Sequence, residues 1–289
     1  MSAVIIDGVA IARKVRTEIS ERAQKLLAQY KVVPGLAVII VGNDPASAVY
    51  VRNKARACAE VGINSDVMRF DATVTEAELI AQIEKLNANP AVHGILVQLP
   101  LPPTISVRRI LETIAVEKDV DGFHLYNVGG LVIGDTVFPP CTPYGVQKIL
   151  EHENISVEGK NVTVVGASNI VGKPMALMLM QKEATVAVCH VKTRNLAEYT
   201  ILADILVVAA GKPNLIVPQM VKTGAVVIDV GINRLPDGRL CGDVEFEGVS
   251  KKASHITPVP GGVGPMTVTM LLDNTVGAAE RAAKLRGPA

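Results

Sequence analysis

Three polar residues in the first half of the chain have the types and positions that acid–base chemistry at the edge of a parallel sheet requires. Tyr50 and Lys54 lie four residues apart in a segment with helical spacing, so they share one helix face. Gln98 closes an apolar run just before a proline-rich segment. A lysine shielded from water has a lowered pKa and can shuttle protons. Two simpler interpretations are also open: Lys54 is an ordinary lysine in contact with solvent, and Gln98 is a residue that caps a loop.

The segment Asp119-Val-Asp121-Gly-Phe-His124 carries two carboxylates and an imidazole, a combination that suggests a metal. A metal site needs a further ligand set at fixed spacing, and the sequence offers none. The four cysteines are scattered and form no C-x-x-C pair. We therefore expect no metal, and Asp121 then either binds a ligand or caps the turn at Gly122.

Residues 161–180 predict a buried strand, a glycine-rich turn and the start of a helix. Such a turn directs backbone N–H groups and the positive end of a helix at an anion, usually a phosphate. The spacing, Gly166-x-Ser168-x-x-x-Gly172, differs from the common G-x-G-x-x-G. Ile170 stands where a nucleophile elbow needs glycine. The turn indicates dinucleotide binding or, alternatively, an ordinary strand–helix connection.

The next predicted strand, 185–189, begins about twenty residues beyond the glycine turn. In an NAD-binding unit its end usually carries an acid for the ribose hydroxyls. Here that end carries Lys192 and Arg194 and no acid. The strand end therefore favours the 2′-phosphate of NADP, unless it is only a solvated basic loop.

Strand and helix patterns alternate along the chain, which predicts an α/β fold with parallel sheets covered by helices on both faces. Residues 117–141 interrupt the alternation with Gly, Pro and Asp, and we expect a loop that leads to a domain junction. The expected strands cover 36–41, 66–70, 92–99, 162–165 and 185–189, and the expected helices cover 10–30, 45–62, 75–88, 105–115, 143–153 and 266–285.

Composition excludes several classes of protein. The 29 basic and 28 acidic residues nearly cancel, and aromatic residues make up 3%, so we expect neither nucleic acid nor a membrane as a partner. No signal peptide and no long apolar span are apparent. Unpaired cysteines are typical of a reducing compartment, and we expect a cytoplasmic protein.

The ordered set of motifs resembles bacterial methylenetetrahydrofolate dehydrogenase/cyclohydrolase, the bifunctional enzyme of one-carbon metabolism. The resemblance spans essentially the whole chain, with the motifs in order and at matching intervals. It rests on Tyr50-Val-Arg-Asn-Lys54, Gly94-Ile-Leu-Val-Gln-Leu-Pro-Leu-Pro102, Asp119-Val-Asp-Gly-Phe-His124, Pro140-Cys-Thr-Pro143, residues 164–174, Asp229-Val-Gly-Ile232 and Pro258-Val-Pro-Gly-Gly-Val-Gly-Pro-Met-Thr267.

The resemblance implies two domains with folate in a cleft between them. Residues 1–140 form a catalytic α/β domain on which the C-terminal helix, 266–289, packs back, and residues 141–265 form a Rossmann NADP-binding domain. The family usually forms homodimers through the Rossmann domain. The resemblance further implies two reactions. The first is NADP-dependent oxidation of 5,10-methylenetetrahydrofolate to 5,10-methenyltetrahydrofolate, and the second is hydrolysis of that product to 10-formyltetrahydrofolate.

The resemblance also implies roles for individual residues. Lys54 is the central catalytic residue, with Tyr50 and Gln98 around it, and Asp121 holds the pterin. The family commonly has Arg where this chain has Ala167, so we expect a smaller preference for NADP than in relatives with that Arg. Further substrate contacts fall on Pro260, Gly261 and Gly262, and cofactor contacts on Gly166, Ala167, Ser168, Ile170, Lys192, Arg194 and Ile232.

Two other functions remain open from the residues themselves. A non-catalytic NADP-binding protein would keep the glycine turn but has no need to keep Lys54, Gln98 and Asp121 together. Another two-domain Rossmann enzyme, such as an amino-acid dehydrogenase, would share the architecture. An assay with methylenetetrahydrofolate and NADP distinguishes all three.

Overall fold

The computed structural model describes residues 2–42 and 45–286, without the side chains of residues 45–50 and 286. The chain divides into two compact units. The six-stranded unit consists of Met1–Arg13 and Thr142–Thr267, and the three-stranded unit consists of Lys14–Cys141 and Val268–Ala289. We had expected the first domain to begin at residue 1. Strand β1, Val4–Ile5, instead pairs with β11, His255–Ile256, and so belongs to the six-stranded unit.

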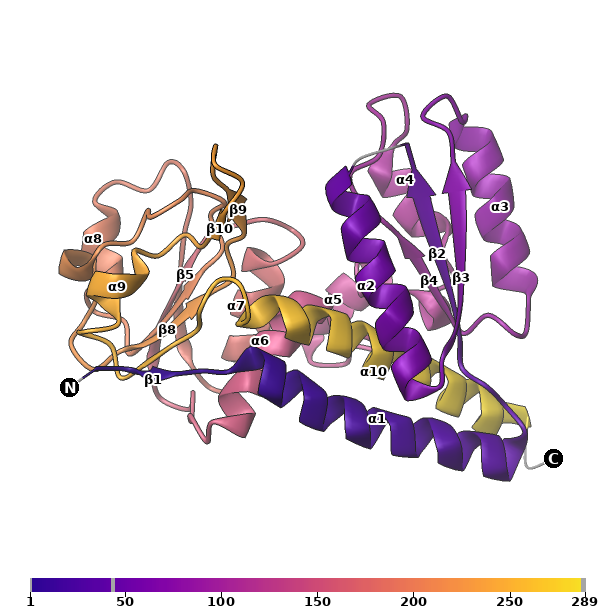
Figure 1. Cartoon of the computed structure of the whole chain (residues 1–289), viewed down its shortest axis with the longest axis horizontal. Helices are drawn as coiled ribbons and strands as arrows, with labels where there is room; N and C mark the ends of the chain where they lie inside the picture. The colour runs from indigo at the N-terminus through magenta and orange to yellow at the C-terminus, as the bar shows by residue number, and fades with distance from the viewer. Residues whose placement is uncertain (1, 43–44, 287–289) are drawn as a thin grey trace. The chain divides into compact units, whose positions relative to one another are not determined.

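The three-stranded unit is built on a parallel sheet of order β3-β2-β4, shown in Figure 1 with its helices. The central strand β2 is buried along its whole length, which explains its uninterrupted apolar sequence. All three strands run in the same direction, so their carboxyl ends meet at one edge. The elements are β2, Gly35–Val41; β3, Asn64–Phe70; β4, Gly94–Val97; α2, Pro45–Val61; α3, Glu76–Ala88; and α4, Val107–Thr113.

The stretch 117–141, expected to be a loop, contains helix α5, Leu125–Ile133, after a short 3-10 turn at Val116–Lys118. The side chain of His124 accepts a hydrogen bond from Tyr126 N–H and caps the start of α5, and Gly134 ends it in the left-handed conformation. The pair Gly129-Gly130 lowers the intrinsic helix propensity of this segment, so the sequence pattern did not predict the helix. Burial of Leu131 offsets that cost.

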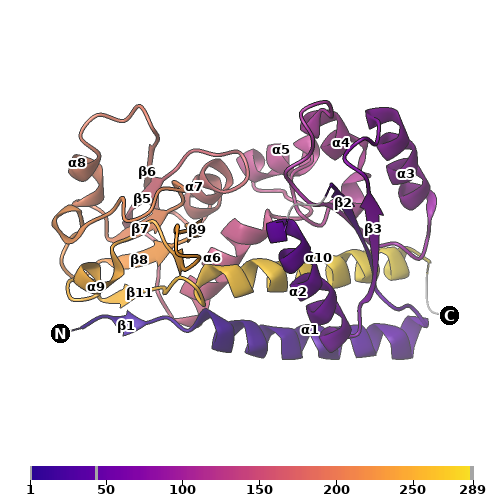
Figure 2. The same ribbon diagram turned by 45° about the horizontal axis from the view of Figure 1, so that its top comes forward.

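The six-stranded unit is a parallel sheet of order β1-β11-β8-β7-β5-β6, visible as a stack of strands in Figure 2. The chain passes from β5 to β6 on one side and then crosses to β7 on the other side of β5. That reversal creates a switch point beyond the carboxyl ends of β5 and β7, where open α/β sheets bind ligands. The elements are β5, Asn161–Val165; β6, Thr185–Cys189; β7, Ile205–Val208; β8, Val226–Asp229; α6, Cys141–His152; α7, Gly172–Met180; α8, Leu196–Thr200; and α9, Phe246–Val249. The smaller elements are the 3-10 turn Pro218–Met220 and the antiparallel pair β9, Asn233–Arg234, and β10, Leu240–Cys241.

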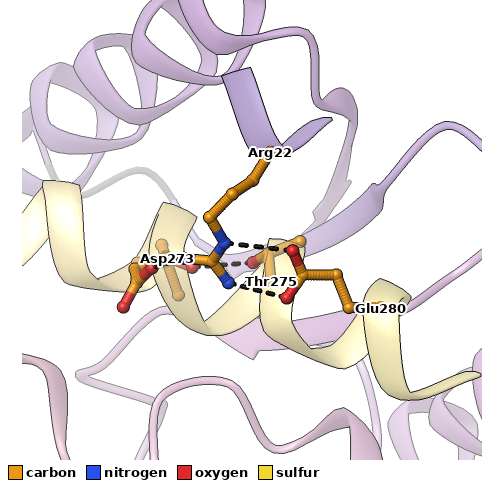
Figure 3. Close-up of polar contacts among 5 residues, drawn as sticks. Arg22, Asp273, Thr275 and Glu280 are labelled. Atoms are coloured by element: carbon orange, nitrogen blue, oxygen red, sulfur yellow. Dashed lines mark hydrogen bonds and ion pairs between the residues drawn. The ribbon is translucent and has the colours of Figure 1, made fainter. Parts of the chain in front are cut away.

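Two long helices, α1, Gly8–Tyr30, and α10, Val263–Arg286, each begin in the six-stranded unit and end in the three-stranded unit. Within the three-stranded unit they lie side by side (Figures 1 and 2) and share a small apolar cluster that includes Leu26 and Ala283. Figure 3 shows Arg22 of α1 between two carboxylates of α10. Its guanidinium forms a two-pronged contact with Glu280, at 3.0 and 2.8 Å, and also pairs with Asp273. The C-terminal helix is therefore fixed to α1 by both apolar and ionic contacts.

Within the described residues, none of the helices combines the length and the apolar character that a membrane span requires.

Candidate active site

Lys54 and Gln98 meet at the carboxyl edge of the three-stranded sheet. Lys54 lies on α2 with only 5% of its surface exposed, and its Nζ donates to Gln98 Oε1 at 3.1 Å. Gln98 follows β4, and its Nε2 donates to the Leu99 carbonyl at 2.8 Å. A carbonyl only accepts, so this second bond fixes the amide with its oxygen toward Lys54. Lys54 is therefore not a solvated lysine, and Gln98 both contacts its own loop and orients Lys54.

The ionisation of Lys54 is set by two opposing influences. Burial lowers the pKa of Lys54 below its ordinary value, and the nearby charge of Asp121 opposes that shift. Burial in turn raises the pKa of Asp121, while the charge of Lys54 opposes that rise. Each of the two groups therefore opposes the effect of burial on the pKa of the other.

Asp121 is held from the far end of the chain. Asn274 of α10 donates to the carbonyl oxygens of Val120 and Pro139, at 2.8 and 3.1 Å. The Cys141 thiol donates to the Val120 carbonyl at 3.3 Å and also interacts with the Asp121 carboxylate. Burial and the charge of Asp121 raise the pKa of the Cys141 thiol, so it is a neutral donor. The C-terminal helix therefore helps to position the segment that carries Asp121.

Asp119 performs the turn-capping role that we had considered for Asp121. Its carboxylate accepts from the N–H groups of Phe123 and His124, at 3.3 and 2.8 Å, and from Asn127 Nδ2 at 2.7 Å. Burial raises the pKa of Asp119 to about 6. In the described part of the chain, no group of three or more His, Cys, Asp or Glu is arranged to hold a metal ion.

The glycine turn after β5 depends on the absence of side chains at two positions. Gly166 has φ +121°, and a Cβ there would lie 2.1 Å from the Ala209 carbonyl oxygen. A Cβ at Gly172 would lie 1.9 Å from the Gly166 carbonyl oxygen. Ser168 Oγ accepts from the N–H groups of Val171 and Gly172, at 3.1 and 3.4 Å, and so joins the turn to the residues at the start of α7. The turn is consequently closely packed against the loop after β7.

The loop after β6 presents Lys192 and Arg194 as exposed cations, beside the glycine turn on the neighbouring strand. The loop is closed by bonds from Lys192 N–H to His190 Nδ1, at 3.1 Å, and from His190 N–H to Thr193 Oγ1, at 2.9 Å. Ala167 is half-buried and supplies no cation. Two exposed cations at this end of the sheet therefore lie on the loop after β6.

The remaining expected site residues fall in different places. Ile170 and Ile232 are exposed, at 44% and 60%, on the loops after β5 and β8. Residues 260–262 lie between β11 and α10, and the approach is so close that a Cβ at Gly8 would lie 1.8 Å from the Gly262 carbonyl oxygen. Tyr50 belongs to α2, and its side chain lies outside the described residues.

A buried carboxylate at the end of β8, absent from the expected site, organises the same edge. Asp229 Oδ1 accepts from the N–H groups of Gly231 and Asp243, both at 3.0 Å, and its Oδ2 accepts from Val244 at 2.9 Å. Burial raises the pKa of Asp229 to about 6. A Cβ at Gly242 would lie 1.9 Å from Asp229 Oδ2, so glycine is needed for this approach. Asp229 thus ties the end of β8 to the segment that begins at residue 242.

Two family models match the chain. Residues 6–121 match the catalytic domain of tetrahydrofolate dehydrogenase/cyclohydrolase, and residues 140–283 match its NAD(P)-binding domain. The chain belongs to the tetrahydrofolate dehydrogenase/cyclohydrolase family. This membership confirms the expected α/β fold, with a catalytic parallel-sheet domain and a Rossmann-like domain that binds NAD(P).

Individual members of the family are similar over nearly the full length. The chain is 62% identical to the bifunctional protein FolD of Nitrosospira multiformis over 99% of this chain and 100% of that one. The crystal structure of FolD from Campylobacter jejuni matches with a TM-score of 0.95 and 53% identity, over 99% of this chain and 100% of that one. FolD from Trypanosoma brucei, whose structure contains NADP and an inhibitor, matches with a TM-score of 0.95 and 40% identity, over 99% of this chain and 100% of that one. The family's dehydrogenase and cyclohydrolase activities, expected from the sequence, are confirmed for this chain.

Sequence reasoning missed the supporting residues of both sites. Cys141 stood within the motif Pro140-Cys-Thr-Pro143 but received no role, and Asp229 and Asp243 received none. A local signal did exist, because glycine adjoins or nearly adjoins both of these aspartates, in Asp229-Val-Gly231 and Gly242-Asp243. Glycine beside a buried carboxylate indicates a close approach between that carboxylate and backbone.

Proposed function

We propose that Lys54, Gln98 and Asp121 carry the chemistry of a bifunctional enzyme that oxidises 5,10-methylenetetrahydrofolate with NADP and hydrolyses the methenyl product to 10-formyltetrahydrofolate. The observation that supports this best is the burial of Lys54 against Gln98 Oε1, with Asp121 as its nearby charge partner. A buried lysine that is linked to a neutral amide and a carboxylate is a proton shuttle in form.

The hydrolytic step needs a water to lose a proton and a folate nitrogen to gain one. Burial lowers the pKa of Lys54. At neutral pH, Lys54 is therefore more often in its neutral form than a solvated lysine, so it can accept a proton from water and release it again. The cationic methenyl group disfavours a second positive charge beside it and lowers the pKa of Lys54 further. Gln98 holds the Lys54 ammonium or amine in place without adding a charge.

Asp121 has the chemistry to bind the pterin. A carboxylate accepts two parallel hydrogen bonds from adjacent N–H donors, as the pterin ring presents them. Because Asp119 caps the turn at residues 122–124, Asp121 is left to face a ligand and Lys54. By the family resemblance, Tyr50 also contacts the substrate, and so do Pro260, Gly261 and Gly262.

The glycine turn of the six-stranded unit has the form of a dinucleotide site, because it leads from the buried parallel strand β5 directly to the start of helix α7. Gly166, Ala167, Ser168, Ile170 and Ile232 hold NADP in this proposal, with Lys192 and Arg194 toward its 2′-phosphate. NADP, when bound there, would supply the acceptor for the hydride of the methylene carbon. The protein's part in that step is alignment, which by itself supplies much of the rate of such reactions.

The proposal includes a homodimer formed through the six-stranded unit. Strand β6 is the edge of its sheet, and Val188 on it is 41% exposed, with Val191 beyond it at 95%. An apolar sheet edge pairs readily with a second copy. We place the enzyme in the cytoplasm, because its four cysteines are unpaired and three of them are buried.

The test uses purified protein with methylenetetrahydrofolate and either NADP or NAD. NADPH formation and methenyl consumption are followed separately, since they report the two steps. Both signals are expected with NADP. If NADP supports no hydride transfer, or if methenyltetrahydrofolate is hydrolysed no faster than in buffer, the proposal is wrong. A light-scattering mass of one chain would contradict the dimer alone.

A further inference from the structure

The carboxylate of Asp243 joins the loops that leave two neighbouring strands, β7 and β8. Its Oδ2 accepts from the N–H groups of Ala210 and Gly211, at 2.6 and 2.9 Å, in the turn after β7. Its Oδ1 accepts from the N–H of Lys212 at 2.9 Å and from Asn233 Nδ2, beyond the end of β8, at 2.8 Å. One side chain therefore sets the spacing between two loops at the carboxyl edge of the sheet.

Asp243 is itself fixed in position. Its backbone N–H donates to Asp229 Oδ1 at 3.0 Å, so its main chain is tied to the end of β8. A Cβ at Gly231 would lie 2.2 Å from the carboxyl carbon of Asp243, so the backbone after β8 packs directly on this carboxylate. Its exposed fraction is 0%, and solvent does not compete for its oxygens.

Of the two loops that Asp243 joins, the one after β7 packs against the glycine turn, and the one after β8 carries the exposed Ile232. A Cβ at Gly166 would lie only 2.1 Å from the Ala209 carbonyl oxygen, so the turn after β7 packs directly against the glycine turn. Ile232 stands between Gly231 and Asn233, both of which interact with Asp229 or Asp243. Asp243 accordingly sits behind both surfaces that a dinucleotide at this edge would touch.

We infer that Asp243 is a positioning residue for the dinucleotide, which acts by holding the turn at 209–212 and the segment around Ile232 at a fixed separation. The inference rests on the proposed function, in which this edge binds NADP. Four N–H donors occupy the roughly four lone-pair sites of a carboxylate. Asp243 therefore acts through backbone, unlike an acid that binds ribose hydroxyls directly.

The test is Asp243→Asn, compared with Asp204→Asn as a matched control. Asn has one acceptor oxygen, so at least one pair of N–H donors loses its partner. Asp204 makes a similar contact at the opposite edge of the same sheet, where it accepts from Asn161 N–H at 2.9 Å and pairs with Lys222 at 2.6 Å. For Asp243→Asn we expect the Kd and KM for NADP to rise about tenfold or more. Hydrolysis of methenyltetrahydrofolate without dinucleotide should be unchanged, and Asp204→Asn should keep the wild-type Kd for NADP.

A wild-type Kd for NADP in folded Asp243→Asn would overturn the inference. Equal increases in Asp243→Asn and Asp204→Asn would also overturn it, because they would indicate general loosening of the sheet. If Asp243→Asn does not fold, Asn233→Ala decides, since it removes one of the four donors and leaves three. A smaller rise in Kd supports the inference, and no rise overturns it. Failure of the wild-type protein to reduce NADP would instead overturn the proposed function.

Discussion

The carboxyl edges of the two sheets use their polar side chains in opposite ways. At the three-stranded sheet, Lys54 and Asp121 interact through their charges, and burial shifts the pKa of each. At the six-stranded sheet, Asp229 and Asp243 are also buried, but their carboxylate oxygens accept hydrogen bonds from backbone N–H groups. The cations there, Lys192 and Arg194, are exposed.

The contrast follows from what each edge has to do. Proton transfer needs a group whose pKa has been moved, and withdrawal from water moves it. Binding a long dinucleotide needs many modest contacts in a fixed shape, and backbone supplies them when side chains behind it hold it still. A single side chain should therefore matter most at the three-stranded edge and less at the six-stranded edge.

The largest effect that this comparison predicts is for Lys54→Met. We expect hydrolysis of methenyltetrahydrofolate to fall by roughly a hundred- to ten-thousand-fold, since a positioned acid–base group is lost. Hydride transfer should survive in part, because it depends mainly on alignment. Separate assays of methenyl consumption and NADPH formation measure the split, with Lys148→Met, on the surface of α6, as the control. Hydrolysis at the wild-type rate would contradict the assignment of Lys54.

Asp121→Ala should show the next largest effect. Donors of the pterin ring would be buried without an acceptor, which we expect to weaken folate binding by about 3 kcal/mol. Loss of the carboxylate charge should also lower the pKa of Lys54 further, since Asp121 opposes the effect of burial. Calorimetry of a folate analogue measures the affinity, and Asp135→Ala, an exposed aspartate after α5, serves as the control. An unchanged affinity in the folded variant would leave Asp121 without a binding role.

Substitutions at the six-stranded edge should change cofactor choice by a smaller amount. Ala167→Arg adds the cation that the family resemblance implies at this position and should widen the preference for NADP over NAD. Lys192→Ala or Arg194→Ala should narrow it, for whichever side chain reaches the phosphate. One charge-assisted contact corresponds to about ten- to a hundredfold in affinity. The ratio of kcat/KM for the two cofactors is the measurement, and a wild-type preference for NAD would show that our interpretation of the loop after β6 is wrong.

The smallest predicted effect concerns a feature that both edges share. Asp119 and Asp229 bind backbone N–H groups, and burial raises the pKa of each to about 6, above the roughly 3.9 of an unfolded chain. The folded protein then binds more protons between pH 4 and 6, so these groups favour folding below that window and lose this contribution as pH rises through it. Wild type should gain stability over Asp119→Asn as pH falls from 6 to 4, by at most about 1.4 kcal/mol per pH unit. Urea unfolding at several pH values measures this, and a constant difference would show that Asp119 does not titrate there.

Most of the fold could be predicted from local sequence patterns, because strand periodicity, helix periodicity and glycine turns each depend on only a few neighbouring residues. The strand predicted at 185–189 has those bounds in the structure, and Lys54 and Gln98 meet as parallel strand ends require. What the sequence concealed depends on contacts between distant residues. Asp229 ends strand β8 and Asp243 lies on a later loop. Asn274 reaches Val120 from a distant part of the sequence, and α5 forms despite two glycines because Leu131 is buried.

The arrangement of the two ends of the chain has a consequence for synthesis. Strand β1 completes its sheet against β11, and Arg22 of α1 finds its carboxylate partners only on α10. Neither unit is one continuous stretch of sequence. As a nascent chain emerges from the ribosome, β1 and α1 must wait for β11 and α10, since domains usually fold as their segments become available. During that interval the apolar face of α1 has no partner on α10, so this chain should depend on early chaperone contact more than a protein whose domains follow one another in order.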